Sequence, residues 1–71
     1  MAKFDGKKFR KLMDEHNLSE RDVAEHIGYT PALVHFFIVG TRKPNLDQAA
    51  GMAQLVNCKV DDLIIEEGTN G

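Results

Sequence analysis

Residues 18–40 read LSERDVAEHIGYTPALVHFFIVG, and the spacing of their apolar side chains predicts two short helices joined by a tight turn. Ser19 is a favourable N-cap for the first helix. Gly28 supplies the left-handed residue at which that helix ends. The inward positions of the first helix recur at helical spacing and are Val23, Ala24 and Ile27.

The second helix of this pair begins after Thr30, which is its N-cap, and Pro31 follows where a missing N–H costs nothing. Val34 and Phe37 lie three residues apart, so they form the stripe that faces the core. The outward face is unusual because it carries few polar side chains. Its residues are Pro31, Ala32, Leu33, Phe36 and Val39.

Length and composition predict one small domain spanning residues 1–71. Of the 71 residues, 42% are hydrophobic. A single core of this size contributes roughly 3–5 kcal/mol, so a partner subunit would add stability. The one cysteine excludes an internal disulfide and favours a reducing compartment. There is no apolar run of the ~20 residues that span a bilayer and no apolar signal segment, so we expect a cytoplasmic protein without membrane contact.

The charge is unevenly distributed along the chain, although the net charge is only −2. This net charge argues against a protein that coats nucleic acid indiscriminately, because such binding depends on neutralising phosphates. The basic residues gather near the amino end and after the second helix of the pair, at Lys3, Lys7, Lys8, Arg10, Lys11, Arg42 and Lys43. Acidic residues gather near the carboxyl end, at Asp61, Asp62, Glu66 and Glu67.

The whole chain is expected to form five helices and no strands, in an all-α domain. A first helix is expected from about Lys7 to His16, with Phe4 folding back onto it. A fourth begins after its cap Asn45 and carries apolar residues at helical spacing, and Asn57 suits a left-handed exit from it. The fifth is short and contains Val60, Leu63 and Ile64, while Ile64 and Ile65 form either a dimer contact or a cover for the core. A frayed tail is expected from about residue 66.

Catalytic and metal-binding patterns are not found. The three histidines, His16, His26 and His35, lack the spacing of a zinc-binding helix. There is no glycine-rich phosphate loop, and Cys58 is interpreted as a packing residue. We therefore expect neither an enzyme nor a cofactor.

The stretch from Phe9 to Ile64 resembles the helix-turn-helix family of phage Cro and repressor proteins and their bacterial relatives, the XRE-like small regulators. The similarity rests on caps, turn residues and core positions, which are Phe9, Leu12, Leu18-Ser19, Val23-Ala24, Ile27-Gly28, Val34, Phe37, Gly40, Pro44, Leu46, Met52-Ala53, Val56 and Val60-Asp61-Asp62-Leu63. The resemblance implies a lambda-repressor-like fold. It also implies a sequence-specific transcription regulator that binds a double-stranded DNA operator, as a weak or DNA-dependent homodimer, with the helix after Thr30 in the major groove.

By this resemblance, positions 31, 32 and 36 reach base edges, and basic residues and hydroxyls contact phosphates. The candidate DNA-binding residues are Arg10, Arg21, Thr30, Pro31, Ala32, Leu33, His35, Phe36, Thr41, Arg42 and Lys43. Apolar side chains cannot form bidentate bonds to guanine or adenine, although Ala32, Leu33 or Phe36 can touch thymine methyl groups. The family often has Gln where this chain has Glu20, and a carboxylate there repels phosphate.

Two further features depart from the family pattern. The family often pairs Arg at position 13 with Glu at position 38, and this chain has Met13 and Ile38, so a hydrophobic contact between them is expected. The outward apolar residues also leave a second interpretation open. In that alternative the domain is an antirepressor-like module that binds another protein, such as a repressor from the same locus, through Leu33, Phe36 and Val39.

Overall fold

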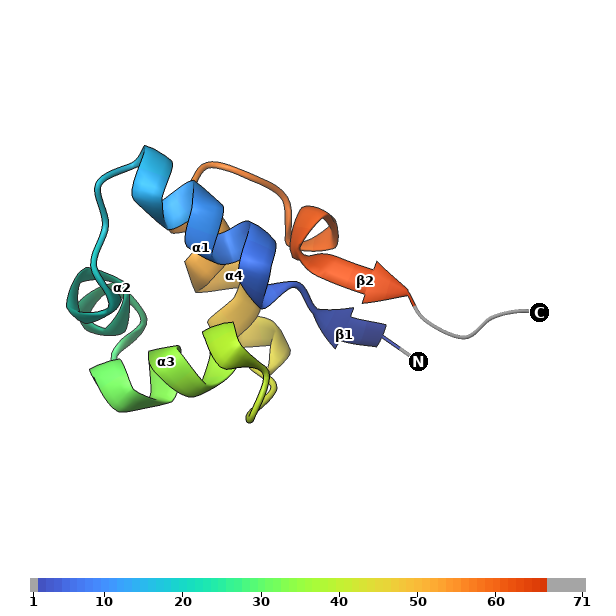
Figure 1. Cartoon of the computed structure of the whole chain (residues 1–71), viewed down its shortest axis with the longest axis horizontal. Coiled ribbons are helices and arrows are strands. Elements are labelled where there is room, and N and C mark those ends of the chain that lie inside the picture. The colour runs from blue at the N-terminus through green and yellow to red at the C-terminus, as the bar shows by residue number, and fades with distance from the viewer. Residues whose placement is uncertain (1, 67–71) are drawn as a thin grey trace.

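The helix–turn–helix pair forms at the expected residues in the computed structural model, which describes residues 2–66 (Figure 1). Helix α2 spans Glu20–Ile27 and helix α3 spans Pro31–Val39. Ser19 caps α2 reciprocally, since its hydroxyl accepts from the Asp22 N–H at 3.1 Å and its own N–H donates to the Asp22 carboxylate at 2.8 Å. Gly28 ends α2 with φ of 80°, which confirms the left-handed stop.

Two more α-helices complete the bundle. Helix α1 spans Gly6–Glu15 and begins one residue earlier than expected, because the Asp5 carboxylate caps it by accepting from the Lys8 N–H. Helix α4 spans Leu46–Leu55 and is capped by Asn45, as predicted. Within residues 2–66 no helix is long and apolar enough to cross a bilayer.

The prediction of five helices and no strands is wrong at both ends of the chain. The expected fifth helix is a single 3-10 turn, η1, at Val60–Leu63, followed by strand β2 at Ile64–Glu66. Strand β2 pairs antiparallel with strand β1, Ala2–Phe4, in the register Lys3 opposite Ile65. Consecutive β-branched residues favour extended backbone, and the partner strand comes from the opposite end of the sequence, so no local pattern reveals the pairing. Glu66 belongs to β2, and the rest of the expected frayed tail lies outside the described residues.

The core lies where the four helices and η1 meet. Phe9, Met13, Val34, Phe37 and Leu63 are among its most deeply buried side chains. Phe4 packs against it, with its ring centroid 5.8 Å from that of Phe9, so the expected return of Phe4 onto α1 is confirmed. The small β-sheet lies at one end of the molecule, away from the α2–α3 turn (Figure 1).

Helices α1 and α3 run in opposite directions and approach each other closely at Gly6. A Cβ atom at Gly6 would overlap the carbonyl oxygen of Ile38. Met13, two turns or about 10 Å further along α1, instead lines a surface hollow with Pro31 and His35 from the other end of α3. Met13 belongs to the core and Ile38 is half-buried against it, but this register does not support the direct contact that we expected between them.

Candidate nucleic-acid interface

The outward face of α3 is an exposed apolar stripe, formed by Ala32, Phe36 and Val39 at positions i, i+4 and i+7. We call these three residues the α3 stripe. Phe36 is 39% exposed and Val39 is 57% exposed, because Val34 and Phe37 occupy the buried side of the helix. Leu33 differs from the expectation: it is half-buried and packs against the core, because it lies closer to the buried side. It is therefore not an exposed anchor.

Polar side chains near the α3 stripe are engaged within the protein. The Thr30 hydroxyl oxygen accepts from the Leu33 N–H at 3.2 Å and caps α3. On one flank of the stripe, Nδ1 of His35 lies 2.8 Å from Oε2 of Glu20. Only Nε2 of the His35 ring remains for another partner.

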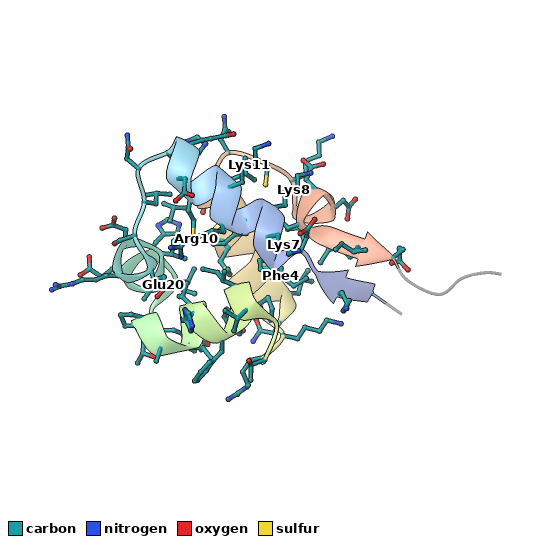
Figure 2. The ribbon with its side chains drawn as sticks, in the orientation of Figure 1. Phe4, Lys7, Lys8, Arg10, Lys11 and Glu20 are labelled. Atoms are coloured by element: carbon teal, nitrogen blue, oxygen red, sulfur yellow. The ribbon has the colours of Figure 1, made fainter. Side chains whose placement is uncertain are left out.

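Glu20 connects three helices through one carboxylate oxygen. Besides His35 from α3, Oε2 of Glu20 accepts a hydrogen bond from the Arg10 guanidinium of α1 at 3.3 Å. Figure 2 shows Arg10 extending from α1 toward Glu20 on α2. Glu20 is only 27% exposed in its side chain, so this carboxylate partly leaves the solvent and orients α3 relative to α1. Sequence reasoning assigned Glu20 a repulsive effect and missed this bridging contact.

Three of the four candidate phosphate-binding cations have a partner within the protein, and the fourth has none among the described residues. Arg10 is bound to Glu20, and Arg21 forms an ion pair with Glu25 at 3.4 Å on the exposed face of α2. The Lys43 ammonium donates to the Ala2 carbonyl oxygen at 3.1 Å and so holds the β1 end of the chain. Arg42 has no side-chain partner among residues 2–66, and it follows the exposed Thr41 directly after α3.

Lysines of α1 form a second group of exposed cations that the site prediction did not include. Lys7, Lys8 and Lys11 line a surface hollow together with Leu12 and the carboxylates of Asp5 and Glu15. Figure 2 shows Lys8 and Lys11 on the side of α1 that is remote from α3. The basic charge of the amino end therefore lies mostly on a different surface from the α3 stripe.

Two side chains among the described residues, Asp22 and Cys58, have pKa values shifted by their surroundings. The backbone and hydroxyl hydrogen bonds of Ser19 hold the pKa of Asp22 below its ordinary value. Burial and the neighbouring Asp62 carboxylate raise the pKa of the Cys58 thiol, as expected for a half-buried packing residue. Within residues 2–66 no three His, Cys, Asp or Glu side chains come close enough together to hold a metal ion.

A family model described as the Cro/C1-type HTH DNA-binding domain matches residues 8–67, which include all four caps of α2 and α3 and every residue of the α3 stripe. The chain belongs to this family. A comparison with curated protein sequences gave no match. As a Cro/C1-type domain, the chain has the mostly helical fold that the resemblance implied, with the two-stranded sheet added at one end.

Solved structures similar to this Cro/C1-type domain confirm the fold. The clp gene regulator ClgR from Corynebacterium glutamicum superposes with a TM-score of 0.76 at 17% identity, over 82% of this chain and 62% of that one. A protein from Bacteroides fragilis gives a TM-score of 0.77 at 22% identity, over 92% of this chain and 100% of the other. A transcriptional regulator from Listeria innocua gives 0.76 at 21% identity, over 97% and 67%.

Proposed function

We propose that this Cro/C1-type domain is a sequence-specific transcription regulator of the phage Cro and repressor type that binds an operator with α3 in the major groove. The observation that carries the proposal is the position of α3. The helix packs on the core mainly through Val34 and Phe37, with Leu33 and Ile38 half-buried beside them, so its opposite stripe stays exposed. Arg42 follows the helix and has no side-chain partner among residues 2–66. An exposed helix of this kind fits the width of the major groove.

The contacts that position the domain differ from those that select a sequence. Arg42 and the Thr41 hydroxyl would contact phosphates beside the groove, and such contacts fix orientation without reading bases. Arg10, Glu20 and His35 would keep α3 at a fixed angle to the rest of the domain. Because Arg21 and Lys43 are bound to partners within the protein, few cations on this surface are free to contact phosphates. This scarcity is consistent with the net charge of −2.

A surface with so few free cations needs a second source of affinity. We infer that two copies bind neighbouring half-sites, about 34–36 Å or a multiple of this apart, as a weak or DNA-dependent dimer. Two linked half-sites raise the apparent affinity because the second binding event becomes intramolecular. An operator-binding protein works where the chromosome is, so the cytoplasmic location stays part of this proposal.

The test compares two single-charge variants in duplex DNA binding across a salt series. Arg42→Ala should weaken binding to every sequence and reduce the slope of log affinity against log salt by about one unit, because it removes one phosphate contact. Lys11→Ala is the matched control: it removes the same charge from an exposed side chain on α1 and should leave binding nearly unchanged. Equal effects of the two variants would contradict the proposed orientation.

A second candidate function has one observation in its favour. Phe36 and Val39 are exposed apolar anchors, which protein interfaces favour, so an antirepressor-like module remains an alternative. Its partner would be a repressor from the same locus. Phe36→Lys distinguishes the two functions, since a lysine preserves or raises non-specific DNA affinity but would be buried unpaired in a protein interface. Loss of repressor binding by a folded variant supports the alternative, and retained binding contradicts it.

A further inference from the structure

We propose that the α3 stripe selects its DNA sequence through the 5-methyl groups of thymine, with Phe36 and Val39 as the contacting side chains. This inference rests on the proposed operator binding and names the base-pair feature that the domain reads. It predicts a half-site in which thymines lie opposite the second and third turns of α3.

The geometry of the stripe defines the reading surface. Ala32, Phe36 and Val39 point in nearly the same direction, because steps of four and three residues return close to one side of an α-helix. Ala32 is small and lets the first turn of α3 approach the groove floor. The Phe36 ring and the Val39 methyl groups stand out from the later turns, and both are exposed in the free protein.

Most hydrogen-bonding groups on the borders of the stripe are already used, and the His35 ring keeps only Nε2, a single atom that cannot form a bidentate pair. Nδ1 of His35 is engaged by Glu20, the same carboxylate binds Arg10, and the Thr30 hydroxyl oxygen caps α3. The stripe itself has no donor or acceptor in its side chains. Bidentate reading of guanine or adenine is therefore not available to the centre of α3.

Thymine is the natural DNA base with an apolar group in the major groove. A·T pairs display the thymine C5-methyl there, whereas cytosine has only a hydrogen at C5. Contact between this methyl group and Phe36 or Val39 removes apolar surface from water on both partners. Thymine pairs are thus favoured by burial, and other pairs leave their polar edges facing apolar side chains without a partner.

The first step of the experiment selects bound sequences from randomised duplexes at low salt. Thymines enriched in the half-site are then replaced one at a time by deoxyuridine, which removes the methyl group and leaves the base-pair hydrogen bonds intact. Replacement at a contacted position should reduce affinity about three- to fivefold, the effect of one buried methyl group. A cytosine at such a position should regain part of the affinity when it carries a 5-methyl group.

Variants assign the effect to the stripe. Phe36→Ala should bind the thymine and deoxyuridine duplexes with nearly equal affinity at the position it contacts. Ile65→Ala is the matched control, because Ile65 is also 39% exposed but lies on β2 at the sheet end of the molecule (Figure 1). This control should keep the full discrimination. Circular dichroism melting checks that both variants are folded.

The outcomes separate this inference from the function on which it rests. Selective binding that is unchanged by deoxyuridine at every enriched thymine overturns methyl reading and leaves operator binding standing. Enrichment of G·C pairs in the half-site likewise overturns methyl reading and leaves operator binding standing. Failure to bind any duplex at low salt overturns both proposals.

Discussion

Nδ1 of His35 lies 2.8 Å from Oε2 of Glu20, and this contact ties the outward flank of α3 to the first turn of α2. The same oxygen accepts from Arg10, so a single carboxylate joins α1, α2 and α3. The arrangement removes both a cation and an imidazole from the surface that we assign to DNA. We therefore expect the affinity of the domain for DNA to depend on Glu20.

Glu20→Gln should increase DNA affinity at low salt and steepen the salt slope by about one unit. The substitution removes a negative charge near the phosphates and releases Arg10 to bind one of them. The cost in folding free energy should stay below about 1 kcal/mol, because Arg10 and His35, the partners of Glu20, are both about half exposed to solvent. Asp61→Asn removes the same charge from η1 and is the control. Weaker DNA binding by Glu20→Gln would show that orienting α3 matters more than freeing Arg10.

Gly6→Ala should destabilise the fold by about 2–3 kcal/mol or more. Its Cβ would overlap the backbone carbonyl of Ile38, and backbone cannot move aside without separating α1 from α3. Gly51→Ala is the comparison, because its Cβ would lie 2.9 Å from Cγ2 of Ile27, a side-chain methyl group that can shift more readily than backbone. The strain in Gly51→Ala is offset because Ala is about 1 kcal/mol more favourable than Gly inside a helix. Urea unfolding that ranks Gly51→Ala as the more destabilised variant would contradict this account.

The local elements were readable from the sequence where their signals are local. Ser19, Gly28, Thr30 and Asn45 each act within three or four residues, so the boundaries of α2, α3 and the start of α4 were predicted correctly. The β1–β2 pair was missed because Lys3 and Ile65 are partners across nearly the whole chain. A pairing of that kind has no periodic pattern in one short segment.

The position of the candidate site could be predicted from the sequence, but the burial and the partners of its side chains could not. The exposure of Phe36 and Val39 follows from helical periodicity, and the structure confirms it. The half-burial of Leu33 and the contact between Glu20 and His35 depend on how neighbouring helices pack. The helix register also places Ile38 beside Gly6, which a family-based pairing of positions 13 and 38 did not reveal.

A double-mutant cycle tests that register. Met13→Ala should cost about 2–4 kcal/mol and Ile38→Ala about 1–3 kcal/mol, since Met13 is fully buried and Ile38 is half-buried. The two costs should add to within about 0.5 kcal/mol, because the residues lie against different ends of the partner helix. A coupling energy above 1 kcal/mol would restore the direct contact that the family pattern suggested.

The capping box of α2 should make stability depend on acid pH. Hydrogen bonds from Ser19 lower the pKa of Asp22 in the folded state. A lowered pKa contributes stability above the unfolded value, about 4, and this contribution is lost as the pH falls through the folded value. Asp22→Asn should therefore melt below the wild type at pH 7, and the difference should shrink below pH 4. A difference in melting temperature that is constant from pH 7 to pH 2 would exclude this role.

Backbone amide chemical shifts, followed while isotope-labelled protein is titrated with a selected duplex, locate the DNA-binding surface residue by residue. If α3 enters the major groove, the largest changes should occur from Ala32 to Lys43 and in the first turn of α2. The amides of Lys7, Lys8 and Lys11 and those of β2 should change least. The largest changes on α1 or β2, with α3 unaffected, would contradict the assignment of α3 as the DNA-binding helix.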